Sequence, residues 1–380
     1  MIPSQAGRFA LLTLLACLGA GPSFAAPPEL SVIGRISGPD GGWDYASVDA
    51  TTHRLFVGRS YGVMVVDLDS GKVTDAFVPG AVVHGVIAIG DTGVGVSANG
   101  KSQLAILFDT KSGKVLASIP TGLDPDAVAY DPATALVAIM EGDAHDALLI
   151  DPKTMKAVGN IPLGGQPEFA ASDGHGHLFV NIVGTHELAT VDIASRSVLG
   201  RAPLPGCEGP TGLAYDPADD LVISVCRNGV ADVTQGKTGA ARASIAIGQG
   251  PTGLALVAGD RLISACRNGI AKILDAKTGA EIASLTIGVG PDAVIADAGR
   301  KLAYIPSGRA GTLAVIAVKG PADIALAETV PTALGARTGA YDAKTGKLYL
   351  PTAQYQLPVA PGTRPQTVPG TFEIVVVGPK

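Results

Sequence analysis

The chain has 380 residues, of which 16% are charged, and its formal net charge is -6. Non-specific binding to nucleic acid or to an anionic membrane needs a basic face, so this charge balance favours neither partner. The 50 glycines and 27 prolines are typical of an all-β protein with many turns.

Residues 1–25 have the pattern of a secretory signal peptide. Arg8 supplies the positive start, an apolar run extends from Phe9 to Gly19, and Ser23-Phe24-Ala25 forms a small-residue cleavage site. A transmembrane anchor fits less well, because the apolar run is short and is broken by Gly and Pro. The segment ending at Cys17 also resembles a lipoprotein signal, which leaves lipid anchoring as an alternative. We therefore expect residues 26–380 to form one domain, periplasmic or secreted, in an oxidising compartment.

After this segment the sequence repeats about every 40 to 45 residues, and each copy holds four short apolar strands separated by polar turns. Typical second, third and fourth strands are Arg54-Leu-Phe-Val, Val63-Met-Val-Val-Asp and Lys114-Val-Leu-Ala-Ser-Ile-Pro. No long segment has the period of a helix. A repeat of this length with four strands predicts a β-propeller. The first strands of the copies begin near Trp43, His84, Asp126, Glu168, Thr211, Thr252, Asp292 and Arg337.

The two ends of the repeat array predict how the ring closes. The last copy stops after its third strand, Phe372-Glu-Ile-Val-Val-Val, and an orphan strand beginning at Leu30 precedes the first copy. Pairing these two segments in one blade would leave no exposed sheet edge. We therefore predict a single all-β propeller of eight four-stranded blades, with seven blades as the alternative if two weak copies merge.

Several short phrases occur together in these copies. They are Gly42-Trp43-Asp44-Tyr45, His84-Gly85-Val86, Pro125-Asp126-Ala127-Val128, Pro167-Glu168-Phe169-Ala170, Cys207-Glu-Gly-Pro-Thr-Gly-Leu-Ala214, Cys226-Arg-Asn228, Gly335-Ala-Arg-Thr338 and Arg364-Pro365. With them the chain resembles the YVTN-type repeat family and, within it, the YncE-like periplasmic propellers. The resemblance implies a seven-bladed ring of mostly undefined function. Here the Pro-Thr-Gly-Leu-Ala…Cys-Arg-Asn unit occurs twice, from Pro210 and from Pro251, so we interpret one blade as duplicated, which widens the channel.

In an antiparallel blade, the start of the first strand and the loop between the second and third strands lie on the same face. The residues that open the first strands therefore surround the mouth of the predicted central channel. Acidic and basic sectors facing each other there could hold a small polar or zwitterionic ligand, with arginines on a carboxylate or phosphate. Alternatively, each charge only caps its own strand or pairs with a neighbour. The acidic residues are Asp44, Asp126, Glu168 and Asp292, and the basic ones are Arg227, Arg267, Arg309 and Arg337.

A long loop from Ala353 to Pro369 replaces the tight turn between the second and third strands of the last copy. Loops of this length in compact domains often act as lids or binding loops. This one carries Tyr355, Arg364 and several prolines, which favour a stiff, extended chain. The pattern suits both a binding loop over the channel mouth and a plug that supports ring closure.

Signals for catalysis or metal binding are weak. His84 with nearby carboxylates could hold a divalent cation, but no spacing of three ligands supports such a site. His175 and His177 fall at the turn before a second strand, on the opposite face. The chain has no nucleophile elbow and no dinucleotide fingerprint, and its pattern identifies no cofactor. An acid–base pair of His84 and Glu168 would be the feature that favours an enzyme.

Three cysteines remain after removal of the signal peptide. Cys226 ends the second strand of the fifth copy and Cys207 lies just before its first strand, so a disulfide could join them at the channel mouth. Cys266 is the repeat counterpart of Cys226, but Ile247 stands where its partner would be. Cys266 is then either a small buried hydrophobe or a reactive or metal-binding thiol.

This pattern favours a monomeric, non-catalytic binding or scaffold protein of the cell envelope, whose partner is a small polar ligand or an envelope protein. The competing class is an enzyme, because propellers of related repeat type include lactone hydrolases and lyases. A quinone-dependent dehydrogenase fits less well, since the chain has one Trp and no vicinal Cys pair. The candidate ligand-binding residues are Trp43, Asp44, His84, Asp126, Glu168, Arg227, Arg267, Arg337 and Arg364.

Overall fold

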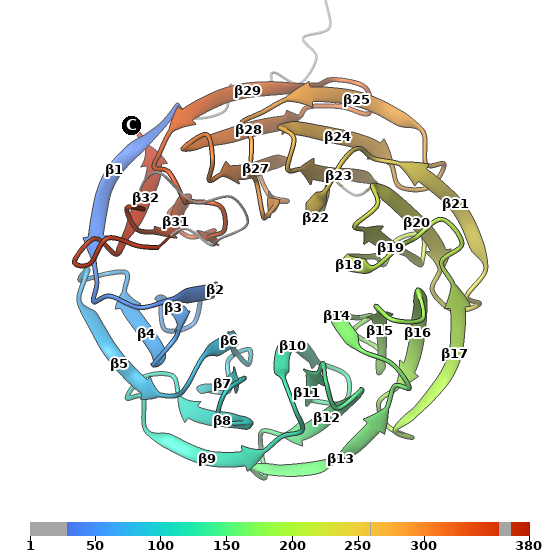
Figure 1. Cartoon of the computed structure of the whole chain (residues 1–380), viewed down its shortest axis with the longest axis horizontal. Coiled ribbons are helices and arrows are strands. Elements are labelled where there is room, and N and C mark those ends of the chain that lie inside the picture. Colours follow the sequence, from blue (N-terminus) through green and yellow to red (C-terminus); the bar gives the residue numbers. More distant parts are fainter. Residues whose placement is uncertain (1–28, 259, 357–365) are drawn as a thin grey trace, which may run out of the picture.

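Eight β-sheets stand around a central axis like the blades of a propeller (Figure 1). The structure, a computed structural model, describes residues 29–258, 260–356 and 366–380. Each sheet contains four antiparallel strands, and none of the described residues belongs to a helix. Accordingly, these ranges contain no helix able to cross a membrane. The prediction of eight four-stranded blades is confirmed, and the seven-bladed alternative is wrong.

We number the blades in chain order from the first complete repeat and give their strands from the axis outward. Blades 1 to 4 comprise β2 (Trp43–Asp49), β3 (Arg54–Arg59), β4 (Gly62–Asp67) and β5 (Val73–Pro79); β6 (Val83–Ala88), β7 (Val94–Asn99), β8 (Leu104–Asp109) and β9 (Val115–Pro120); β10 (Pro125–Asp131), β11 (Leu136–Glu141), β12 (Asp146–Asp151) and β13 (Lys156–Pro162); β14 (Pro167–Ser172), β15 (His177–Ile182), β16 (Glu187–Asp192) and β17 (Ser197–Pro203). Blades 5 to 8 comprise β18 (Pro210–Asp216), β19 (Leu221–Cys226), β20 (Val230–Gln235) and β21 (Ala241–Ala246); β22 (Pro251–Val257), β23 (Arg261–Cys266), β24 (Ile270–Asp275) and β25 (Glu281–Thr286); β26 (Ile295–Asp297), β27 (Leu302–Ser307), β28 (Thr312–Val318) and β29 (Ile324–Pro331); β30 (Ala340–Asp342), β31 (Lys347–Thr352), β32 (Glu373–Pro379) and β1 (Leu30–Ser37).

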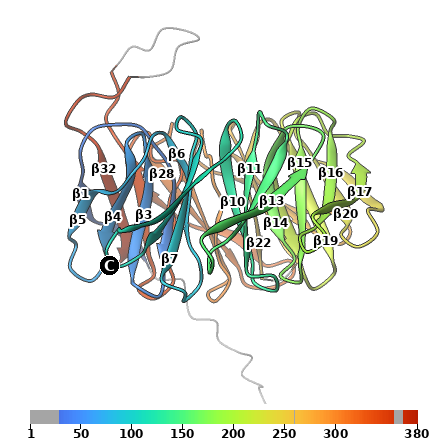
Figure 2. The same cartoon turned by 90° about the horizontal axis from the view of Figure 1, so that it is seen from below.

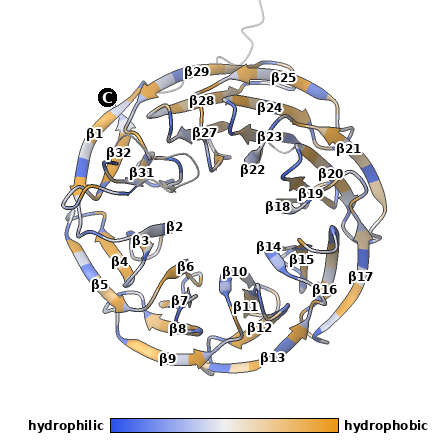
Figure 3. Ribbon diagram, in the orientation of Figure 1, coloured by the Kyte–Doolittle hydropathy of each residue, from blue (hydrophilic) through white to orange (hydrophobic). Residues whose placement is uncertain are grey.

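The hydrophobic core lies between neighbouring blades. Each of the eight interfaces has its own cluster of buried apolar side chains, such as the one that contains Leu149 of blade 3 and Val180 of blade 4. Middle strands such as β19 are buried on both faces, whereas outermost strands such as β21 alternate between exposed and half-buried residues. In Figure 3 the outermost strands carry both hydrophilic and hydrophobic residues along their length. This is why the sequence shows continuous apolar runs in some strands and alternating polarity in others.

The ring closes in blade 8, where β1 is the outermost strand beside β32. Their register runs from Leu30 opposite Pro379 to Ser37 opposite Glu373, so the predicted closure by the N-terminal strand is confirmed.

Arg59 fastens the closing strand to blade 1. Its fully buried guanidinium lies 3.6 Å from the ring centroid of Phe372 and donates hydrogen bonds to the carbonyl oxygens of Pro39 and Gly42 at 2.7 and 3.1 Å. Those carbonyls belong to the segment that joins β1 to β2, and Phe372 directly precedes β32. The Arg59 side chain therefore contacts the chain beside both strands of the closing pair, β1 and β32. Sequence reasoning did not single out Arg59.

The far end of the first strand carries an aspartate in six of the eight blades. Its carboxylate accepts a hydrogen bond from a backbone N–H two or three residues later, as from Thr51 to Asp49 at 2.9 Å, and so caps the following turn. This repeated position stabilises the face opposite to the predicted mouth. The six residues are Asp49, Asp131, Asp173, Asp216, Asp297 and Asp342.

Candidate functional site

One repeat position near the start of each first strand is exposed or half-buried in every blade and differs from blade to blade. In blades 1 to 6 a β-bulge follows the first ladder pair of this strand, as between Pro125 and Val128. Bulges re-aim the side chains beside them, which suits a functional position. We call these residues the mouth ring: in blades 1 to 7 they directly follow the first ladder or bridge position, and in blade 8, whose ladder begins at Ala340, the equivalent repeat position is Arg337. They are Asp44, His84, Asp126, Glu168, Thr211, Thr252, Asp292 and Arg337.

Most of the predicted charges at this face bind one another across blade boundaries. Each contact joins a blade to the next one in the ring, and all three involve partly exposed side chains. The alternative prediction, in which the charges pair with their neighbours, therefore describes these six residues. The pairs are Asp44–His84 at 2.8 Å, Glu168–Arg227 at 3.6 Å and Asp292–Arg337 at 3.2 Å.

Three of the charged residues predicted at this face have no such partner. Asp126, Arg267 and Arg309 make no ion pair and no side-chain hydrogen bond with any described residue. Asp126 belongs to blade 3, and the two arginines belong to blades 6 and 7, on the other side of the axis (Figure 1). The pairing thus leaves one negative sector and one positive sector unneutralised.

The negative sector has a distinct electrostatic character. Burial raises the pKa of Asp126 to about 6; His84 lowers this pKa, whereas Asp44 and Glu168 are among the carboxylates that raise it. Tyr45 is 47% exposed, yet burial of its phenol end and then the charge of Asp126 raise its pKa as well. Sequence reasoning missed Tyr45, although it lies on the same strand, one residue after Asp44. An aromatic ring among carboxylates is an environment that favours a cation.

Trp43 lies in a different place from the predicted one. It pairs with Arg59 in the ladder, which puts it one position before the mouth ring. Its ring packs on Phe372 with centroids 5.3 Å apart, within the cluster between blades 8 and 1. The bulge that follows Trp43 accounts for the difference, because it shifts which residue of β2 occupies the mouth position.

His84 and Glu168 do not form the acid–base pair that would favour an enzyme. His84 binds Asp44, and Glu168 pairs with Arg227. No hydrogen bond joins His84 to Glu168. The bond from Asp44 raises the pKa of His84, which favours its protonated form and makes it a poorer base or metal ligand. Among the described residues, no group of three or more His, Cys, Asp or Glu side chains could hold a metal ion.

The predicted long loop joins β31 to β32, and its residues 357–365 lie outside the described part of the chain, Arg364 among them. The described ends pair with each other: the Gln356 N–H donates to the Gln366 carbonyl at 2.8 Å, and Tyr355 bridges Thr367. Burial raises the pKa of Tyr355, and the nearby Arg337 partly opposes this rise. The base of the loop therefore rises from the mouth face beside blade 8 (Figure 2).

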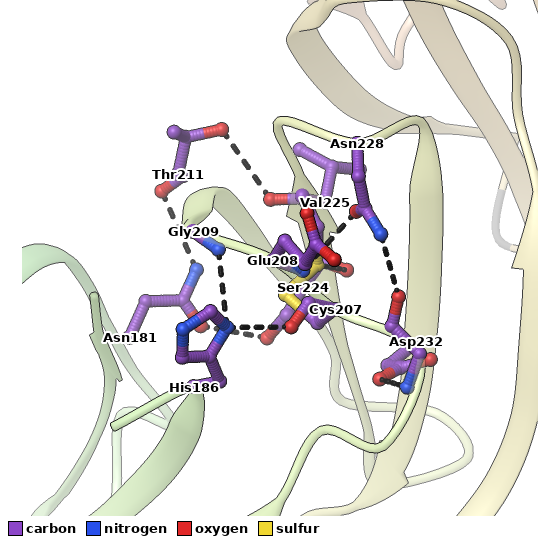
Figure 4. The surroundings of a disulfide bond; sticks show 12 residues. Asn181, His186, Cys207, Glu208, Gly209, Thr211, Ser224, Val225, Asn228 and Asp232 are labelled. Atoms are coloured by element: carbon purple, nitrogen blue, oxygen red, sulfur yellow. Dashed lines mark hydrogen bonds between the residues drawn. A yellow bond between two sulfur atoms is a disulfide. The ribbon is translucent and has the colours of Figure 1, made fainter. Parts of the chain in front are cut away.

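Cys207 and Cys226 form a disulfide with their Cα atoms 5.2 Å apart, which confirms the predicted bridge (Figure 4). The Nδ1 atom of His186 from blade 4 lies 2.7 Å from the Cys207 carbonyl oxygen and holds the connection from the other side. Arg227 directly follows Cys226, and its stem lies against Gly209. The bridge therefore fixes the two segments that position Arg227 on the mouth face.

Cys266 is fully buried, and burial raises its pKa to about 11, which disfavours the reactive thiolate. Its sulfur lies 3.0 Å from the Ile247 carbonyl oxygen. Counting back three residues from the equivalent ladder prolines shows that Gly248, rather than Ile247 as predicted, takes the place of Cys207. The prediction was wrong because the turn between the first and second strands is one residue shorter in blade 6 than in blade 5, so that Pro251 and Cys266 are one residue closer in sequence than Pro210 and Cys226.

A cavity of about 230 Å³ lies away from the mouth ring, at the outer side of blades 4 and 5, where Pro203, Asp232 and Arg242 are among its lining residues. Small-molecule sites usually enclose roughly 300–1,000 Å³. Because this cavity is smaller, it does not displace the mouth ring as the candidate site.

No protein-family model and no curated protein matches the chain, whereas solved structures match its fold. The hydrazine synthase of Kuenenia stuttgartiensis is 18% identical, with a TM-score of 0.58 over 73% of this chain and 96% of that one. A chain of a mitotic checkpoint complex is 12% identical, with a TM-score of 0.57 over 92% of this chain and 96% of that one. At such identities the likeness shows the β-propeller fold alone.

Proposed function

We propose that this protein binds a small polar ligand or an envelope protein at its mouth ring and catalyses no reaction. One observation carries the proposal: the two ends of the first strand differ in how far their residues recur from blade to blade. At one end, six blades place an aspartate that caps a turn. At the other end, the eight blades place acids, a histidine, threonines and an arginine in no repeating order, and all of these residues are exposed or half-buried. In a fold built from repeats, the residues that folding requires recur at the same position of each repeat. Variation at an exposed position therefore indicates a role other than folding.

We further propose that the protein is exported and acts as a YncE-like monomer in the periplasm or outside the cell. The signal-peptide pattern of residues 1–25 supports export, with lipid anchoring at Cys17 as the alternative. The disulfide between Cys207 and Cys226 fits an oxidising compartment.

Native mass spectrometry tests the proposal on the mature protein purified from its own envelope fraction. We expect a co-purifying small molecule or partner protein that is released when the mouth ring is altered. A variant with Asp126→Asn, Arg267→Ala and Arg309→Ala serves for this comparison, since none of the three side chains has an ion pair to lose among the residues that the structure describes. A bare chain, or a bound mass that the variant retains, would contradict binding at the ring.

A further inference from the structure

Three arginines on the mouth face are held by the same device in consecutive blades. The stem of each lies over the glycine that precedes the first strand of its own blade, and all three glycines have a positive φ. A Cβ on Gly209 or Gly290 would crowd the arginine, and one on Gly250 would make an ordinary contact with Arg267, so each stem packs directly against its glycine. The nearest side-chain carbons of Arg227, Arg267 and Arg309 would lie 3.1, 3.5 and 2.5 Å from a Cβ on Gly209, Gly250 and Gly290.

The acidic partner of this device does not repeat. Arg227 of blade 5 reaches back to Glu168, at the mouth position of blade 4. Blade 6 repeats the arginine of blade 5 almost identically, but the mouth position behind it holds Thr211 in place of a carboxylate. In the same way, a threonine of blade 6 takes the place of the carboxylate behind the arginine of blade 7. The two arginines without their carboxylate are Arg267, behind which lies Thr211, and Arg309, behind which lies Thr252.

The two unpaired arginines are also neighbours. The Gly290 N–H donates to the carbonyl oxygen of Arg267 at 3.0 Å, and the stem of Arg309 lies over the same glycine. Two exposed arginines therefore stand beside Gly290, and neither makes an ion pair with a residue in the described part of the chain. Guanidinium groups match the planar geometry of carboxylate and phosphate, and an anion between two of them relieves their repulsion.

We propose that Arg267 and Arg309 bind an oxyanion group of the ligand, a carboxylate or a phosphate, in the place that Glu168 takes against Arg227. This inference rests on the proposed function, because it names the chemistry of the ligand that the mouth ring binds. The threonines make room for the oxyanion by replacing a carboxylate with a shorter, neutral side chain.

The opposite side of the ring limits what else the ligand carries. Asp126 makes no ion pair there with any described residue, and the partly exposed Tyr45 interacts electrostatically with it. A second anionic group reaching across the axis would meet this negative sector, whereas an ammonium group would be attracted to it. A ligand that spans the ring is therefore zwitterionic, with its oxyanion on blades 6 and 7.

Isothermal titration calorimetry at low ionic strength tests this assignment with three probes: inorganic phosphate, succinate and 4-aminobutyrate. We expect saturable binding of phosphate or 4-aminobutyrate by the wild type, and tighter binding of 4-aminobutyrate than of succinate. The double variant Arg267→Ala/Arg309→Ala should bind at least tenfold more weakly. Arg196→Ala removes a positive charge at a turn on the opposite face and should change the affinity less than twofold.

Thr211→Glu is the sharpest variant, because it restores the missing carboxylate and should neutralise Arg267 internally. We expect it to bind the probes at least tenfold more weakly than Thr211→Gln, which has the same shape without the charge. Equal affinities for these two variants would overturn the proposal, as would binding that survives the double substitution. If the wild type binds none of the probes, the oxyanion assignment is wrong. In that case the proposed binding function still stands if native mass spectrometry finds a bound molecule. If the chain carries no bound molecule, both the oxyanion assignment and the proposed function are wrong.

Discussion

Replacing Cys207 by serine should lower the free energy of unfolding by about 3 kcal/mol. The bridge spans a sequence separation of 19. Closing a loop of that size removes about 11 cal/mol/K of entropy from the unfolded chain, which corresponds to about 3 kcal/mol at 25 °C. With roughly 2 cal/mol/K of unfolding entropy per residue over a domain of about 350 residues, the melting temperature should fall by about 4 °C.

Differential scanning calorimetry measures this effect on the wild type, on Cys207→Ser and on the double variant Cys207→Ala/Cys226→Ala. Both cysteines are at most 5% exposed, so the wild-type bridge must be reduced in the unfolded state and its thiols counted before refolding. Cys266→Ala is the matched control, because it removes a buried cysteine that forms no bridge. An unchanged melting temperature in Cys207→Ser, or in wild type refolded with both thiols free, would refute the reasoning.

Three further predictions concern buried charged groups, and urea unfolding across a pH series measures all of them. The hydrogen bond to Asp342 raises the pKa of His53 above 6.5. Protonated His53 therefore stabilises the folded protein below pH 6.5, and this contribution to the free energy of unfolding is lost as the pH rises through the folded pKa. His53→Gln should remove this loss. Burial and then Asp146 raise the pKa of Glu141 above 4.5, so stability should fall as the pH rises from 4.5 towards that raised pKa; Glu141→Gln should flatten the slope. Arg59→Met leaves the carbonyl oxygens of Pro39 and Gly41 without their donor, whereas that of Gly42 keeps its bond from the Ser60 N–H. The substitution should cost about 2–5 kcal/mol, and a loss below about 1 kcal/mol would contradict the role of Arg59 in closure.

The blade count and the closure could be predicted from the sequence because both depend on short-range patterns. Each first strand ends in an Asp or an apolar residue at a fixed distance from its polar start, and the strands after it are runs of apolar residues. The disulfide was predictable for the same reason, since Cys226 ends a strand whose register is set by the turn before it. Local rules of this kind need no knowledge of the neighbouring blade.

The contacts between blades were not predictable in this way. Whether Glu168 meets Arg227 or His84 depends on how two sheets are placed relative to each other, and the bulge in the first strands of blades 1 to 6 alters where the mouth residue points. Arg59 illustrates the same limit, because its partner Phe372 is more than 300 residues away in sequence. The misplaced counterpart of Cys207 has a simpler cause, because the turn between the first and second strands is one residue shorter in blade 6 than in blade 5.

A crystal structure of the mature protein, purified from its own envelope fraction without added ligand, tests the central claim most directly. The account predicts electron density for a bound molecule over the mouth ring, with a carboxylate or phosphate between Arg267 and Arg309 and any cationic end towards Asp126. A ligand bound elsewhere, or a co-purified molecule that leaves both guanidinium groups uncontacted, would contradict it.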